Sequence, residues 1–163
     1  MSNYLYLPGV AGNYASAPDT AALSITGDID IQARVALDDW TPAQETAIVS
    51  KYIATNDHRS YMFVVRSGST GLLRFYWSED GVALLAVTSS VAPTVSDGDY
   101  LWIRVILDVD DGPIGQGRGI FYTGGSGVSP TWVQLGDTAG GGSVPTFIFD
   151  GLHPVEVGAY ANG

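Results

Sequence analysis

The stretch "TGDIDIQARVAL", residues 26–37, places two carboxylates where they could act together. Asp28 and Asp30 are two positions apart, and on a β-strand such residues leave the same face. Retaining glycoside hydrolases use an acid/base and a nucleophile whose carboxyl groups lie about 5–5.5 Å apart, which one strand can roughly supply. Gln32 takes the next position on that face, and an amide cannot donate and recover a proton. We therefore expect Asp28 and Asp30 to form a solvated outer row and not a catalytic pair.

A second group of carboxylates lies in "DVDDG", residues 108–112. Calcium prefers closely spaced oxygen ligands, which makes Asp108, Asp110 and Asp111 the first candidates for a calcium site. An EF-hand that began at Asp108 would need a bidentate Glu at the twelfth position, where Gly119 stands. The sequence favours the alternative, a polar turn after a long strand, so we expect neither a metal nor another cofactor.

Aromatic residues are the remaining candidate ligand surface, because sugars stack on exposed rings. The chain has four tryptophans and nine tyrosines. Trp77 and Trp102 lie within predicted strands and are expected in the core or at its flank, whereas Trp40 and Trp132 border loops. Trp40 and Trp132 are therefore the predicted ligand residues, although exposed aromatic side chains are also typical of subunit interfaces.

Composition excludes several classes of function. The net charge is −10 with only seven Lys and Arg, so the basic patch that a nucleic acid requires is absent. The chain has no cysteine, which excludes disulfides and thiol nucleophiles, and both His58 and His153 lie in turn-like contexts away from any nucleophile motif. No apolar run has the length of a membrane span. The length of 163 residues predicts one domain, residues 1–163.

Period-two alternation of apolar residues predicts an all-β fold with antiparallel strands. The two longest predicted strands are residues 28–37 and 99–109. The only helical candidate, "TPAQETA" at 41–47, predicts at most one turn, and Asp80-Gly81 predicts a tight hairpin. Short strands at regular spacing, separated by Gly, Pro and Asp, indicate a β-sandwich or barrel. The shorter predicted strands are residues 46–53, 60–66, 72–78, 82–89, 118–123, 131–135, 146–149 and 154–158.

The order of several segments resembles the concanavalin A-like, laminin-G-like modules of tailed-phage virion proteins. The more distinctive segments are the strand that ends in "ALDDW" and the "FYT…WVQLG" stretch, and the resemblance covers nearly the whole chain. It implies a β-sandwich of jelly-roll type. Laminarinase-type glycosidases share this broad fold with a Glu-x-Asp-x-(x)-Glu strand motif, of which Asp28 and Asp30 could imitate only the first two carboxylates.

Modules of this kind continue past an "EVGA"-like strand into a closing strand beside the start of the chain, whereas this sequence stops at Gly163. Either the module is complete in a shorter form or a neighbouring subunit covers the open edge, which makes a homo-oligomer the expected state.

We expect a non-enzymatic structural protein located on the virion, a capsid decoration or minor capsid protein that binds the major capsid protein or other virion subunits. The alternative is a carbohydrate-binding adhesin module of a tail fibre or tail tip, which binds host-surface glycans. Neither function involves nucleic acid or membrane insertion.

Overall fold

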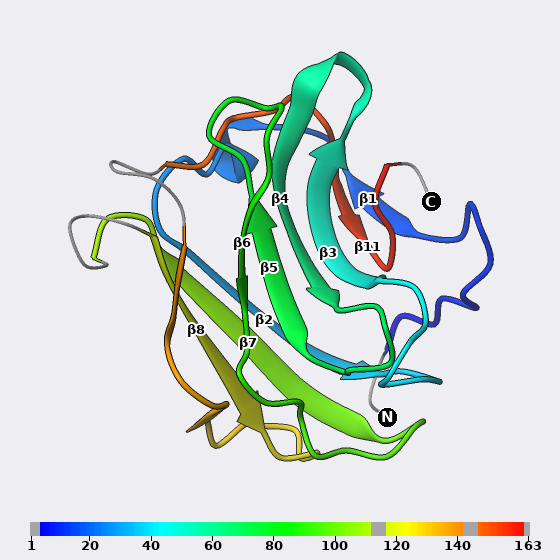
Figure 1. Cartoon of the computed structure of the whole chain (residues 1–163). Helices are drawn as coiled ribbons and strands as arrows, with labels where there is room; N and C mark the ends of the chain where they lie inside the picture. Colours follow the sequence, from blue (N-terminus) through cyan, green and yellow to red (C-terminus); the bar gives the residue numbers. More distant parts are fainter. Residues whose placement is uncertain (1–3, 112–116, 142–146, 162–163) are drawn as a thin grey trace.

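Two antiparallel β-sheets pack face to face, which confirms the predicted all-β sandwich (Figure 1). The protein is seen in a computed structural model, which describes residues 4–111, 117–141 and 147–161. The six-stranded sheet has the order β1-β11-β3-β4-β5-β6. Its strands are β1 (Ala15–Ala17), β3 (Thr46–Ile53), β4 (His58–Val65), β5 (Leu73–Trp77), β6 (Leu85–Thr88) and β11 (Val155–Val157).

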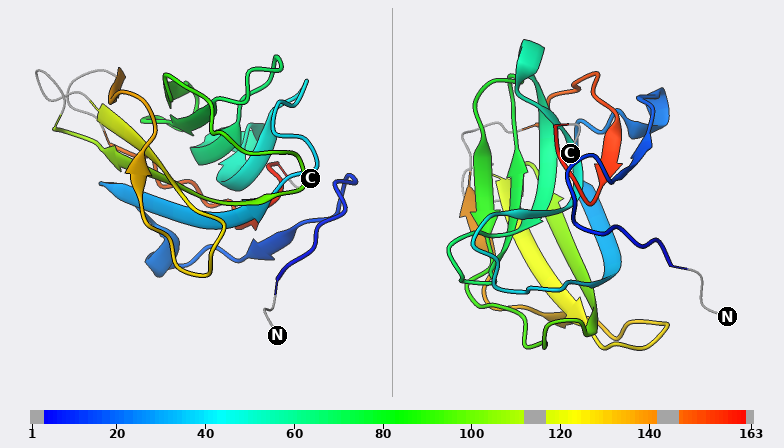
Figure 2. Two further views of the ribbon diagram at one scale, coloured as in Figure 1. Left: turned by 90° about the horizontal axis from the view of Figure 1, so that it is seen from below. Right: turned by 90° about the vertical axis from the view of Figure 1, so that its right-hand side faces the viewer.

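The five-stranded sheet has the order β10-β8-β7-β2, and a fifth strand, β9, also pairs with β8. Figure 1 shows this sheet behind the six-stranded one, and the left view of Figure 2 shows the two twisted sheets as separate layers. Two short 3-10 helices, η1 (Ala21–Leu23) and η2 (Thr55–Asp57), are the helical segments among the described residues. The strands of this sheet are β2 (Ile29–Ala36), β7 (Tyr100–Asp108), β8 (Gly117–Gly124), β9 (Val133–Gln134) and β10 (Ala139–Gly141).

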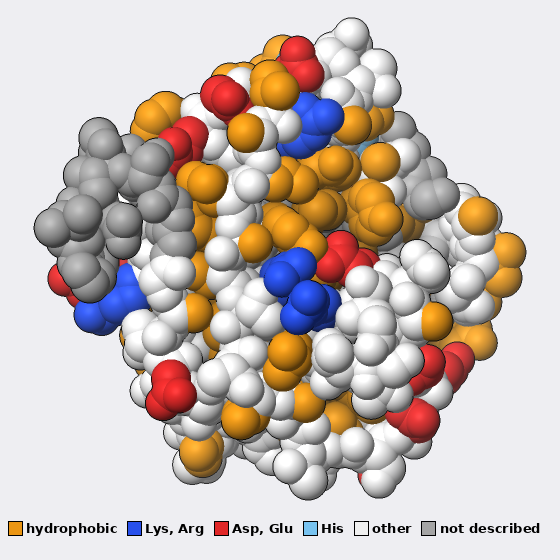
Figure 3. Space-filling view, in the orientation of Figure 1, with side chains coloured by type: hydrophobic (Ala, Val, Ile, Leu, Met, Phe, Trp, Pro, Cys, Tyr) orange, Lys and Arg blue, Asp and Glu red, His pale blue; other side chains and the backbone are white. Residues whose placement is uncertain are grey.

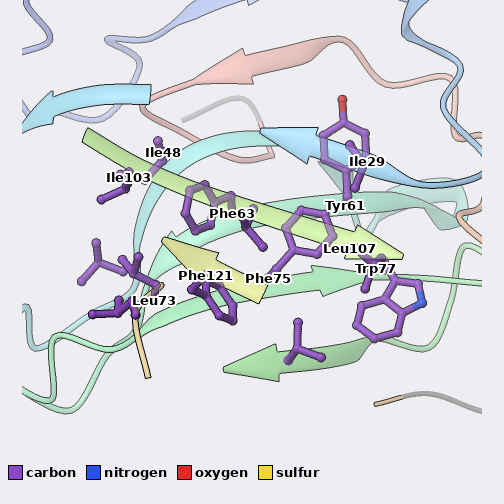
Figure 4. Close-up of a cluster of buried hydrophobic side chains, with 14 of the residues drawn as sticks. Ile29, Ile48, Tyr61, Phe63, Leu73, Phe75, Trp77, Ile103, Leu107 and Phe121 are labelled. Carbon is purple, nitrogen blue, oxygen red and sulfur yellow. The ribbon is translucent and has the colours of Figure 1, made fainter. Parts of the chain in front are cut away.

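The core lies between the inner faces of the two sheets, where the alternating apolar residues of each strand meet (Figure 4). Phe63 of β4 and Phe121 of β8 are both fully buried, and their ring centroids lie 6.4 Å apart across the two sheets. Gly119 of β8 makes room for the opposite sheet, because a Cβ atom there would lie 2.4 Å from a methyl carbon of Val87. Side chains from both sheets therefore interdigitate in one continuous core.

Most strand predictions agree with the structure, and the exceptions have local causes. The Asp80-Gly81 turn has the expected positive φ at Gly81, but it lies in a longer loop, because Asp80 Oδ1 accepts the N–H groups of both Val82 and Ala83. Residues 147–149, the described part of the strand expected at 146–149, form no strand. The 41–47 stretch has no helix, and β1 and β10 were not predicted because three small residues are too short a segment for an alternation to be recognised.

The "EVGA" segment itself lies beside the start of the chain. Within it, β11 pairs with β1 on one side, with Ala15 opposite Val157, and with β3 on the other. The longest open edge lies elsewhere, along β2, which among the described strands pairs with β7 alone. No described helix has the length and apolar character needed to cross a membrane.

Candidate functional site

The outer face of the five-stranded sheet carries a cluster of charged and aromatic side chains around Arg104. The Arg104 guanidinium binds Asp30 with both branches, with Nε 2.8 Å from Oδ1 and Nη2 2.6 Å from Oδ2. Its Cζ atom lies 5.4 Å from the ring centroid of Tyr122 and 5.6 Å from that of Trp132. We call these four residues, together with Trp102, the Arg104 platform: Asp30, Trp102, Arg104, Tyr122 and Trp132.

Strand register explains why residues far apart in sequence meet in the Arg104 platform. Arg104 lies opposite Tyr122 of β8, so both side chains leave the same face of the sheet. Trp132 immediately precedes β9, which pairs with β8. The Trp102 and Trp132 rings meet edge to face with centroids 6.1 Å apart. The hydrogen bonds that Arg104 donates to Asp30 raise the pKa of Arg104 above its usual value, so the guanidinium stays charged in its ion pair with Asp30.

The loop 125–132 is held against this outer face by two side chains. Trp102 Nε1 donates to the carbonyl of Gly127 at 2.8 Å, and Arg34 donates to the carbonyl of Ser126 at 2.7 Å through Nη2. Gly124 permits the close approach, since a Cβ atom there would lie 2.6 Å from Cβ of Pro130. A depression of about 580 Å³ adjoins the loop and is lined in part by Arg34, Ser126 and Asp99.

A planar guanidinium beside partly exposed rings can bind a sugar, because rings accept the apolar face of a pyranose and polar groups bind its hydroxyls. Gln32 and Gln134 add exposed amides to the same face, in the row that contains Arg104 and Tyr122. The sequence predicted Trp132 but missed Arg104 and Tyr122. The alternation of residues 99–109 could have identified Arg104, because it places this residue on the face of the strand opposite the apolar Ile103 and Val105.

Trp40, the other predicted ligand residue, does not lie on the surface. Its side chain is only 4% exposed and belongs to the core cluster. The segment after β2 folds back over the sandwich, because Asp97 Oδ1 accepts the Trp40 N–H at 2.8 Å and Leu37 O accepts the Gly98 N–H. The prediction that Trp40 is an exposed ligand residue is therefore wrong.

The two acidic groups of the sequence meet at one end of β2 and β7. Carboxylate oxygens of Asp28, Asp108 and Asp110 all lie within 4.8 Å of one another. Asp111 is not part of this group, since it forms an ion pair with Arg118 at 2.9 Å. Asp28, Asp108 and Asp110 could supply hard oxygen ligands to a divalent cation, although calcium takes six to eight oxygen ligands and three carboxylates alone do not complete its shell.

Asp28 and Asp30 have different hydrogen-bond partners. Asp28 Oδ1 accepts the N–H of Val109 at 3.0 Å, whereas both oxygens of Asp30 bind Arg104.

On the outer face of the other sheet, Tyr76 donates to Glu45 at 2.7 Å and accepts a hydrogen bond from Arg74. Burial and the bond to Glu45 raise the pKa of Tyr76. Figure 3 shows this face, where hydrophobic side chains surround a few charged ones.

A second cation is held inside the molecule. Lys51, the only lysine of the chain, is 1% exposed and lies 2.8 Å from Asp19 and 3.0 Å from Asp150. Its neighbour in the register is Tyr61, a core residue whose pKa is raised to about 12 by burial. His153, which the sequence places in a turn-like context, is also buried and lies 3.2 Å from Glu156.

Comparison with known proteins adds no relative: the chain matches no protein-family model, no curated protein and no solved structure.

Proposed function

We propose that the chain is a non-enzymatic structural protein of a tailed-phage virion, namely a capsid decoration or minor capsid protein. The proposal is supported by the resemblance of its ordered segments to laminin-G-like virion modules and by the β-sandwich that this resemblance implies. The partners would be the major capsid protein or other virion subunits. The net charge of −10 would keep decorated particles soluble and apart.

One observation carries this proposal: the N-terminal segment presents large apolar side chains to solvent. Tyr4 and Tyr6 are each 72% exposed, and Leu5 and Val10 are each 60% exposed. Figures 1 and 2 show this end of the chain running away from the two sheets. Adjacent exposed apolar side chains are typical of surfaces that a protein partner buries. The segment is therefore suited to anchor the sandwich on another subunit.

Co-sedimentation with capsids that lack the chain tests the proposal. We expect the wild-type chain to bind such capsids saturably, and a variant with Tyr4→Ser, Leu5→Ser and Tyr6→Ser to bind about tenfold more weakly or worse. The matched control is Val128→Ser, which removes an 84% exposed apolar side chain from a different surface. Absence of wild-type binding, or equal binding of the triple variant, contradicts the proposal.

The Arg104 platform supports a second candidate, the carbohydrate-binding adhesin module. Its partly exposed rings surround a cation and lie beside the exposed amides of Gln32 and Gln134. A glycan of the host surface would stack on Tyr122 or Trp132, and Arg104 and the amides would bind its hydroxyls. In this function the particle would attach through many weak contacts.

A glycan array with matched variants tests the second candidate. Trp132→Ala removes a ring on which a sugar would stack, so it should abolish detectable binding of any glycan that the wild type retains. The neighbouring Val133→Ala, which removes an exposed apolar side chain outside the Arg104 platform, should leave the glycan signal unchanged. A glycan signal that survives Trp132→Ala and Tyr122→Ala would place glycan binding elsewhere.

A further inference from the structure

Strand β2 is the edge strand of the five-stranded sheet, and it is longer than the other edge strands of the described residues. The other edge strands are short, with three residues in β1, four in β6 and three in β10, whereas β2 has eight. Within the described part of the chain, β2 pairs with β7 on one side, and no backbone group outside that pairing binds residues Ile29–Ala36. Short edges are a common protection against strand addition, and β2 lacks this protection.

The core is also less well covered along β2 than along its neighbour. Ile31, Ala33 and Val35, which belong to the inward row of β2, remain partly exposed. Their partners in the register are Val105, Ile103 and Leu101 of β7, of which the first two are fully buried. A further strand beside β2 would remove this apolar surface from water, which favours its addition.

The sequence of β2 is complementary to itself when it is read in the opposite direction. Around Gln32 the order is Ile-Asp-Ile-Gln-Ala-Arg-Val, with apolar residues at every second position and Asp30 and Arg34 at equal distances from the centre. In an antiparallel pair of two copies centred on Gln32, Asp30 of each copy lies opposite Arg34 of the other. Facing residues of such a pair share one face of the sheet, and facing opposite charges attract.

Other registers lose this complementarity. If the two-fold axis passed through Ile31, Asp30 would face Gln32 of the other copy, and if it passed through Ala33, Asp30 would face Ala36. If the two-fold axis passed between two residues, each inward apolar residue would lie opposite an outward polar residue of the other copy. An antiparallel ladder does not allow this, because residues that face each other point to the same side of the sheet. The charges therefore select the register centred on Gln32.

We propose that two copies of this chain associate through their β2 edges in this register and form one continuous antiparallel sheet across a two-fold axis. The interface is the same patch on both copies, as two-fold symmetry requires. Asp30 can take part while it binds Arg104, because a carboxylate has about four acceptor sites. Arg34 binds Ser126 through Nε and Nη2, and its Nη1 has no hydrogen-bond partner among the described residues.

This association does not depend on a place in a virion, since it uses only the chain itself. A dimer in solution that fails to bind capsids would contradict the proposed function and leave the β2 interface standing. Conversely, capsid binding by a strictly monomeric chain would contradict the β2 interface alone.

Sedimentation equilibrium of the full 163-residue chain, from micromolar to millimolar concentration, tests the interface. We expect a monomer–dimer equilibrium for the wild type. Gln32→Lys places two like charges against each other at the two-fold axis and should raise the dissociation constant about tenfold or more. Ser16→Lys is the matched control, because it adds the same charge to an exposed residue of an edge strand in the other sheet and should leave the constant unchanged.

A charge exchange tests the register. Arg34→Glu brings two acidic residues together at each end of the interface, and Asp30→Lys brings two basic ones together, so each variant alone should be monomeric. An equimolar mixture restores one opposite-charge pair at each end and should form a heterodimer. Thermal unfolding of each variant confirms that it is folded.

Three outcomes overturn the proposal. A wild-type chain that stays monomeric at every concentration excludes the association. A dimer that Gln32→Lys leaves intact uses another surface. A mixture of Arg34→Glu and Asp30→Lys that stays monomeric excludes the register centred on Gln32.

Discussion

The interior of the sandwich and its outer face each hold a cation against carboxylates, but in opposite surroundings. Lys51 is 1% exposed and lies between Asp19 and Asp150, with the carbonyl of Leu23 3.3 Å away. Arg104 is 22% exposed, and its partner Asp30 is 41% exposed. Lys51 joins segments that are distant in sequence, whereas Arg104 lies on the outer face of the five-stranded sheet beside aromatic rings.

This difference separates stability from binding. The Lys51 ammonium is buried, and without its carboxylates it would remain in a medium that solvates it poorly, so the partners of Lys51 matter for stability. An exposed pair contributes little, because water and salt screen it. Arg104 can therefore exchange partners or accept a ligand at small cost in stability, and the outer face is where binding can evolve.

The largest contrast is expected between two adjacent residues of β8. Phe121 is fully buried in the core, and Tyr122 lies on the outer face over Arg104. We expect Phe121→Ala to lower the free energy of unfolding by about 4 kcal/mol, because it leaves a cavity, and Tyr122→Ala to lower it by less than about 1 kcal/mol. Urea denaturation measures both values. Similar losses for the two variants would mean that the outer face is as tightly packed as the core.

Removal of the two cations should give the next largest contrast. Lys51→Met leaves Asp19 and Asp150 without their cation, and because these carboxylates are 24% and 40% exposed, the expected cost is about 1–2 kcal/mol of unfolding free energy. Arg104→Met removes the same charge from the surface and should cost less than about 1 kcal/mol. The same urea titrations report both, and the smaller loss should shrink further in high salt. A Lys51→Met protein as stable as the wild type would show that the attraction between Lys51 and its carboxylates only offsets the free energy needed to remove these charges from water.

Acid unfolding should reveal the Lys51 site through Asp150. The hydrogen bond from Lys51 lowers the pKa of Asp150 below its ordinary value of about 3.9. The ionised carboxylate therefore stabilises the fold above that pH, and the contribution is lost as the pH falls through the lowered pKa. Asp150→Asn should lose less stability than the wild type on acidification, as measured by thermal unfolding at successive pH values. Lys51→Met should show the same flattening, because it removes the cause of the shift.

The smallest effect is expected from the carboxylates at the end of β2 and β7. Asp110→Asn relieves repulsion among Asp28, Asp108 and Asp110 and should raise the melting temperature by about 1 °C at low salt, an effect that salt removes. Asp111→Asn is the control, since it gives up the ion pair with Arg118 and should produce no rise. A calcium-dependent rise in the wild type that Asp110→Asn abolishes would instead show a cation site here.

Much of the fold could be predicted because strand alternation is a local signal. The strand Thr46–Ile53 begins and ends where it was expected, and Leu101, Ile103, Val105 and Leu107 are buried on the predicted inner face. The site was less predictable. Trp132 lies near the surface as expected, whereas Trp40 is buried, because a tryptophan beside a turn can point into the core or out of it depending on how the loop returns.

The sequence by itself determined the two-sided strands and the solvated row that begins with Asp28 and Asp30, since period-two alternation assigns each residue to a face before any strand has a neighbour. Only the tertiary structure decided which rows became neighbours. It brought Asp28 to Asp108, Arg104 to Trp132 and Lys51 to Asp150, and it left β2 with a free edge. These contacts depend on register and loop path over long sequence separations, and no local pattern encodes either of them.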